Sequence, residues 1–127
     1  MHLIIDIGNT NIVFSIVEGD IVKEKWRIAT DINRTSDEYY LWLSSILKEK
    51  FNPKNVIIGS VVPEVTEEIK TACKNYFNKS VYIINEDVKI SFPMNVENNR
   101  EVGTDRLVNS IAAWDIYKKA CIIIDFG

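Results

Sequence analysis

The sequence predicts an α/β domain in which a mixed sheet opens with three antiparallel strands and carries helices on its faces. Residues 2–28 alternate between apolar and polar side chains and contain two glycine turns, which is typical of consecutive hairpin strands. Apolar residues then recur at helical spacing in three segments, and short apolar runs lie between those segments. A length of 127 residues with 46% hydrophobic and 26% charged residues fits one globular domain.

Strands are expected over residues 2–7, 11–17 and 21–28. Gly8-Asn9 separates the first two strands, and Glu18-Gly19-Asp20 forms the turn before the third. Both are turn sequences that reverse the chain over a few residues, because glycine and asparagine tolerate turn geometry. We expect Gly8 to adopt a positive φ.

Three helices are expected in the rest of the chain. The first begins at Ser36, a suitable N-cap, and ends near Lys50. Pro63, at the favoured first position, begins the second, whose apolar face carries Val65, Ile69, Ala72, Cys73, Tyr76 and Phe77. The third begins near Gly103-Thr104 and carries Leu107, Val108, Ile111, Ala112, Trp114 and Ile116.

Buried strands are expected at residues 56–60, 81–84 and 121–125. Three antiparallel strands followed by alternating helices and strands are the order of a ribonuclease H-like domain. Residues 122–127 (IIIDFG) repeat the pattern of residues 3–8 (LIIDIG). We therefore expect residues 1–119 to form a first domain. Residues 120–127 would be the first strand of a second, homologous domain or the last strand of the first.

Charge and composition exclude several classes of protein. A formal net charge of −3 without a basic cluster argues against a nucleic-acid-binding protein. The apolar runs are far shorter than a membrane span needs, and Asp6 interrupts the N-terminal run, so we expect no membrane segment and no signal peptide. Cys73 and Cys121 are expected to be reduced core thiols. The expected location is the cytoplasm.

The first candidate site is the segment Asp6-Ile7-Gly8-Asn9-Thr10. It places a carboxylate at a strand tip and follows it with a glycine and two short polar side chains. Backbone N–H groups and the Thr10 hydroxyl can donate to phosphate oxygens, and Asp6 can hold Mg²⁺ through water. The alternative is an ordinary hairpin turn.

The second candidate site is the helix start at Gly103-Thr104-Asp105-Arg106. A helix N-terminus attracts anions, Arg106 offers a guanidinium fork for a carboxylate, and Asp105 can accept a proton from a hydroxyl. The alternative is that Thr104 or Asp105 caps the helix and that Arg106 forms a surface ion pair. The sequence contains neither a P-loop nor a protein-kinase glycine loop.

Three motifs in order resemble the type III pantothenate kinase family, within the actin-like and sugar-kinase ATPases. They are DIGNT at residues 6–10, GTDRLVN at residues 103–109 and DFG at residues 125–127. The resemblance covers the whole sequence but about half of a family member. It implies an ATP-dependent kinase that phosphorylates pantothenate to 4'-phosphopantothenate, the first step of coenzyme A biosynthesis.

The resemblance also implies a role for each matching residue. Asp105 would be the catalytic base. Magnesium would be held by Asp6 through water, and a monovalent cation, potassium or ammonium, by Asp125. The residues that would bind ATP are Asp6, Ile7, Gly8, Asn9, Thr10, Asn11, Ile12 and Val13. The residues that would bind pantothenate are Val96, Gly103, Thr104, Asp105 and Arg106.

One departure from the family pattern affects the pantothenate contacts. Val96 stands where many members have a tyrosine, and an apolar side chain can line a pocket but cannot form a hydrogen bond. The resemblance further implies a homodimer with pantothenate and ATP as its partners. Two alternatives remain: a non-catalytic regulator of the accessory transcription factor type, and a sugar or acetate kinase of the same superfamily.

Overall fold

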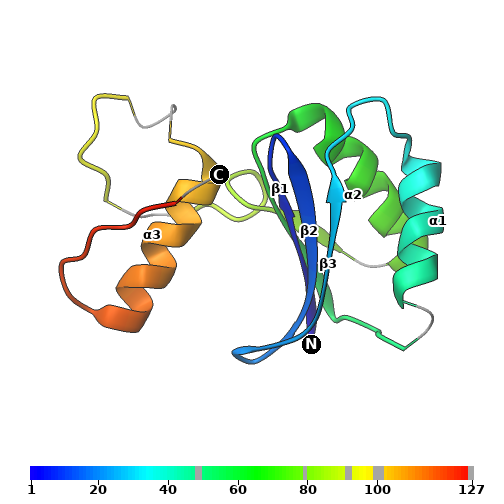
Figure 1. Ribbon diagram of the computed structural model, residues 1–127, viewed down its shortest axis with the longest axis horizontal. Coiled ribbons are helices and arrows are strands. Elements are labelled where there is room, and N and C mark those ends of the chain that lie inside the picture. Colours follow the sequence, from blue (N-terminus) through cyan, green and yellow to red (C-terminus); the bar gives the residue numbers. More distant parts are fainter. Residues whose placement is uncertain (48–49, 79, 91–92, 99–101, 126–127) are drawn as a thin grey trace.

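The computed structural model describes residues 1–47, 50–78, 80–90, 93–98 and 102–125 (Figure 1). The order of the elements matches the prediction as far as the third helix. The elements are β1 (His2–Ile7), β2 (Asn11–Glu18), β3 (Ile21–Ala29), α1 (Ser36–Leu47), β4 (Asn55–Ser60), α2 (Pro63–Phe77), β5 (Val81–Ile83) and α3 (Thr104–Tyr117).

The strands form one mixed sheet in the order β3-β2-β1-β4-β5. β1 pairs antiparallel with β2 and β2 antiparallel with β3, whereas β1, β4 and β5 run parallel. The predicted α/β class with three antiparallel N-terminal strands is therefore confirmed. Because β1 and β4 are parallel, their carboxyl ends lie at the same sheet edge, where Asp6 is the register partner of Gly59.

The core lies between the sheet and two helices that cover the same face, α1 and α2 (Figure 1). Alternate residues of β1 and β2 point into it, as expected from the period of two in a strand. The largest fully buried side chains are Tyr39, Phe14, Leu3, Ile5, Ile7, Ile12, Ile16, Leu43, Leu47, Ile58, Ile69 and Val56. Burial of each large apolar side chain contributes about 1.5–3 kcal/mol, which holds these elements together.

The cap of α1 differs from the prediction by one residue. The Thr35 hydroxyl oxygen accepts a 3.4 Å hydrogen bond from the Glu38 N–H, and a Glu38 carboxylate oxygen accepts a 2.8 Å bond from the Thr35 N–H. This reciprocal pair is a capping box, and it makes Thr35 rather than Ser36 the N-cap. The Ser36 N–H instead donates to Glu68 of α2, which ties the two helices together.

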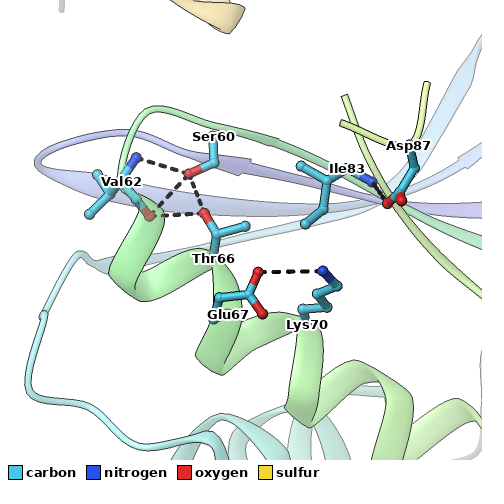
Figure 2. A network of polar contacts seen from close by, with 7 residues as sticks. All are labelled: Ser60, Val62, Thr66, Glu67, Lys70, Ile83 and Asp87. Carbon is cyan, nitrogen blue, oxygen red and sulfur yellow. Dashed lines mark hydrogen bonds and ion pairs between the residues drawn. The ribbon is translucent and has the colours of Figure 1, made fainter. Parts of the chain in front are cut away.

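A small polar network fixes the connection between β4 and α2 (Figure 2). The Thr66 hydroxyl lies 2.7 Å from Ser60 Oγ and 2.8 Å from the Val62 carbonyl oxygen, and the Val62 N–H donates to Ser60 Oγ. Val61, between these residues, donates its N–H to the Ile7 carbonyl. The network therefore holds Val61 beside the carboxyl end of β1.

The helix α3 lies on the opposite side of the sheet from α1 and α2 (Figure 1). Leu107 is its buried residue, whereas Trp114 and Ile116 are 52% and 72% exposed. Its N-terminus is the part that meets the sheet, where Thr104 lies near Gly59. Much of the predicted apolar face of this helix is thus open to solvent.

The prediction of a buried strand at residues 121–125 is wrong for this structure. These residues form no strand and are exposed; Ile122 and Ile124 are 91% and 72% exposed. The prediction that Cys121 is a core thiol is therefore wrong, because Cys121 is exposed, whereas Cys73 is buried as predicted. A strand needs a neighbouring backbone to accept and donate its hydrogen bonds, and no described strand pairs with this segment. Phe126 and Gly127 lie outside the described residues.

None of the described helices is both long enough and apolar enough to cross a lipid bilayer.

Candidate functional site

The turn between β1 and β2, residues Gly8 to Thr10, is fixed by three hydrogen bonds. The Gly8 N–H donates to the Asn11 carbonyl at 3.0 Å. The Thr30 hydroxyl donates to the Gly8 carbonyl at 2.6 Å, and the Thr30 N–H donates to the Thr10 carbonyl at 2.9 Å. Thr30, just after β3, therefore holds both ends of the turn.

Glycine is favoured at residue 8 for a reason different from the predicted one. Its φ is not positive, because Gly19 is the glycine with a positive φ among the described residues. A Cβ at residue 8 would instead lie 3.2 Å from the Asn11 carbonyl oxygen. Close approach of two backbone segments is thus what favours glycine here.

The turn presents unused hydrogen-bond donors to solvent. Within the described part of the chain, neither the backbone N–H groups nor the side chains of Asn9 and Thr10 donate a hydrogen bond. Both residues are exposed. Backbone N–H groups and a hydroxyl at one turn are donors suited to phosphate oxygens.

The second predicted segment places Asp105 beside this turn. Gly103 is the N-cap of α3 and no side chain caps the helix, so the capping alternative for Thr104 and Asp105 is wrong. A Cβ on Gly103 would clash with Asp105 Oδ1. Glycine at this position therefore leaves room for the Asp105 carboxylate in its present orientation.

Asp6, Asp105 and Asp125 all line one open hollow of about 510 Å³. Its lining also includes Val61, Arg27 and residues 7–11 and 13. The pKa of Asp6 is raised, first by desolvation through partial burial and then by the negative charges of Asp105 and Asp125, while Lys25 lowers it. Burial and the two neighbouring carboxylates thus make Asp6 harder to ionise than a free aspartate.

The geometry separates some of the predicted site residues from this hollow. The Ile12 side chain is fully buried in the core, so it faces away from the turn's donors. Arg106 lines a neighbouring hollow with Asn109, Ser110, Ile123 and Asp125. Val96 is exposed in an irregular segment and lines neither hollow.

Two residues that were not predicted as site residues form hydrogen bonds to the predicted segments. Thr30 anchors the turn, and Asn109 of α3 donates a 3.1 Å hydrogen bond to the Asp125 carboxylate. Asn109 belongs to the GTDRLVN motif, which could have indicated it. Arg27 is a third residue that sequence reasoning missed, because its place in the hollow depends on the strand register.

The donors in the hollow fit a magnesium ion held through water better than one held directly by several side chains. In the part of the chain that the structure describes, no group of three or more His, Cys, Asp and Glu side chains is placed to hold a metal ion together. Mg²⁺ retains several of its waters in protein sites and needs one or two carboxylates. Asp6 beside the unused donors of the turn fits that mode of binding through water.

Comparisons with known proteins agree with these motifs. Residues 2–127 match the family described as type III pantothenate kinase. The chain is 40% identical to a type III pantothenate kinase of Syntrophotalea carbinolica, 39% to one of Exiguobacterium sibiricum and 42% to one of Paramagnetospirillum magneticum. Each alignment covers 100% of this chain but 51–52% of the relative. The chain thus spans about half the length of these relatives.

Proposed function

Because the chain belongs to the type III pantothenate kinase family, we propose that it supplies the phosphate-binding turn and the acceptor base of an ATP-dependent pantothenate kinase. The product would be 4'-phosphopantothenate, formed in the first step of coenzyme A biosynthesis. One observation supports this most strongly. Asp105 lies in the same hollow as the Gly8-Asn9-Thr10 turn, so a base and a set of phosphate donors face one volume.

The turn would hold the phosphates of ATP. The unused N–H groups of Asn9 and Thr10 and the Thr10 hydroxyl would donate to phosphate oxygens. Magnesium, when bound, supplies neutralisation of phosphate charge. Asp6 would hold it through water. The pKa of Asp6 is raised mainly by desolvation and secondarily by the charges of Asp105 and Asp125, and a cation would offset both effects.

Asp105 would be the general base for pantothenate, the substrate that accepts the phosphoryl group. Its carboxylate would accept the proton of the primary hydroxyl of pantothenate as the hydroxyl oxygen attacks the γ-phosphorus. The bond from that phosphorus to the bridging oxygen breaks, and ADP leaves. Thr104 and Gly103 would approach the substrate at the helix start, and Arg106 would hold its carboxylate. Asp125, oriented by Asn109, would bind the monovalent cation.

Exposed apolar side chains on α3 and on the segment after it support the proposal of a second domain. Trp114 and Ile116 of α3 and Ile122 and Ile124 of the following segment are exposed, and the relatives are about twice as long as this chain. We propose that residues 120–127 pair with a second domain that completes the ATP cleft. We also propose that the active protein is a homodimer, to be checked by light scattering.

A chimera tests this function. Residues 1–127 replace the corresponding half of the Syntrophotalea carbinolica relative, and pantothenate-dependent release of ADP is measured. The proposal predicts turnover by the chimera and none by the 127-residue chain alone. A folded chimera without turnover, beside an active parent relative, would contradict the proposal.

The regulatory alternative makes a different prediction. A non-catalytic protein of the accessory transcription factor type has no reason to consume ATP faster when pantothenate is added. An increase in ADP release by the chimera on adding pantothenate, but not on adding acetate or a hexose, would exclude this alternative. It would also exclude a sugar or acetate kinase.

A further inference from the structure

The hollow that holds Asp6, Asp105 and Asp125 has one basic side chain among the described residues that line it, Arg27 of β3. Arg27 is exposed, and no hydrogen bond or ion pair to a described residue holds it. An arginine that has no partner among the described residues can offer its donors to a ligand in the hollow. Its five N–H donors suit phosphate oxygens.

The strand register explains how Arg27 reaches the hollow. Asp6 of β1 is the partner of Val13 of β2, and Val13 is the partner of Arg27 of β3. The three residues form one row on the same sheet face, away from α1 and α2. Neighbouring strands lie about 4.8 Å apart, so the Cα atoms of Asp6 and Arg27 are roughly 10 Å apart. Asp6 and Arg27 thus line the same hollow from two strands, β1 and β3.

The charge balance indicates what kind of ligand Arg27 would bind. A polyphosphate approaching the Gly8-Asn9-Thr10 turn meets negative charge from three aspartates, which the unused N–H groups offset only in part. Lys25, which also belongs to β3, lowers the pKa of Asp6 through its positive charge. Arg27 lies one step further along β3, in the same row as Asp6.

We propose that Arg27 is a phosphate-binding residue whose guanidinium holds oxygens of the nucleotide's triphosphate chain from the β3 side of the hollow. This rests on the proposed function, because it requires triphosphate at the turn. The Gly8-Asn9-Thr10 turn would bind the same chain from the β1 side. Arg27 would thus supply positive charge from this domain.

The test is a titration of the ¹⁵N-labelled 127-residue chain with inorganic triphosphate and Mg²⁺ to millimolar concentrations. The shifts of the Gly8, Asn9 and Thr10 amide NMR signals report binding. Charge-assisted hydrogen bonds to an anion are strong enough that Arg27→Gln should weaken binding by about tenfold or more. Arg27→Lys should recover part of that loss. Lys25→Gln is the matched control, since it removes the same charge from the same face but does not line the hollow.

The outcomes of the titration distinguish the role of Arg27 from the phosphate-binding function of the turn. Weakening by Arg27→Gln well beyond that by Lys25→Gln supports the proposal. Equal weakening by both variants, or none by Arg27→Gln, overturns the role of Arg27 while the turn remains a phosphate site. An Arg27→Gln effect on pantothenate binding but not on triphosphate also overturns it. If the wild-type amides do not respond to triphosphate, the phosphate-binding function of the turn fails together with this inference.

Discussion

The Thr30 hydroxyl donates a 2.6 Å hydrogen bond to the carbonyl of Gly8, 22 residues earlier in the chain. The bond joins the end of β3 to the turn that follows β1. With the Thr30 N–H bond to Thr10, it orients the turn without using the N–H groups of Asn9 and Thr10. The structure therefore makes Thr30 a positioning residue for the proposed phosphate site.

Thr30→Val should keep the shape of the side chain but remove this hydrogen bond. The Gly8 carbonyl then loses its donor, which costs about 1 kcal/mol of unfolding free energy, with up to about 3 kcal/mol where water cannot replace it. Thr30→Ser retains a hydroxyl and should recover most of the loss. Urea unfolding of the three proteins measures this, and equal stabilities of Thr30→Val and wild type would show that the bond contributes nothing.

Gly103→Ala should change the orientation of the Asp105 carboxylate but change the stability of the fold little. A Cβ at residue 103 clashes with Asp105 Oδ1, so the carboxylate has to leave its present orientation. We expect activity of the chimera to fall strongly while its melting temperature changes little. Gly19→Ala is the stability control, since Gly19 has φ +59° in a turn away from the site. That variant should cost stability and leave activity intact.

The raised pKa of Asp6 predicts a definite pH dependence of stability. A carboxylate with a higher pKa in the folded state than in the unfolded state binds protons better when folded, so its contribution falls as pH rises from about 3.8. Asp6→Asn should therefore stabilise the protein at neutral pH, with the gain disappearing at acid pH. Denaturation with urea across this range measures it. A gain that is the same at all pH values would contradict the electrostatic cause.

The two cysteines should differ sharply in reactivity. Cys121 is exposed, whereas burial raises the pKa of the Cys73 thiol to about 12, and the thiolate is the reactive form. A thiol reagent at neutral pH should label Cys121 in the folded protein and Cys73 only after unfolding. Mass spectrometry of the labelled peptides checks this. Rapid labelling of Cys73 under native conditions would contradict its place in the core.

Much of the fold could be predicted because periodicity reports local geometry. The alternation in residues 2–28 and the helical spacing after Ser36 each depend on neighbours in sequence, and both predictions are confirmed. The run at residues 121–125 carries the same apolar signal but has no described strand to pair with. Its apolar composition favours burial, but the local sequence does not specify the neighbouring strand with which it would pair.

The candidate site could be predicted only in part for the same reason. The turn and the start of α3 have motifs with their own local chemistry, so their residues could be named from the sequence. Arg27 and Thr30 reach the turn through the pairing of β2 with β3 and through a hydrogen bond to Gly8. Neither relation is visible until the register is known. The positive φ predicted for Gly8 is wrong, and close approach of the Asn11 carbonyl oxygen explains why glycine is favoured there.

The central claim is that Asp105 is the base for a hydroxyl acceptor, and Asp105→Asn in the chimera tests it most directly. We expect pantothenate-dependent ADP release to fall by about 10²–10⁴-fold, the usual loss for a general base, with little change in ATP binding. Asp115→Asn is the matched control, because Asp115 lies on the same helix in a surface pair with Lys118, and it should retain near wild-type turnover. Near wild-type turnover by Asp105→Asn would contradict the claim.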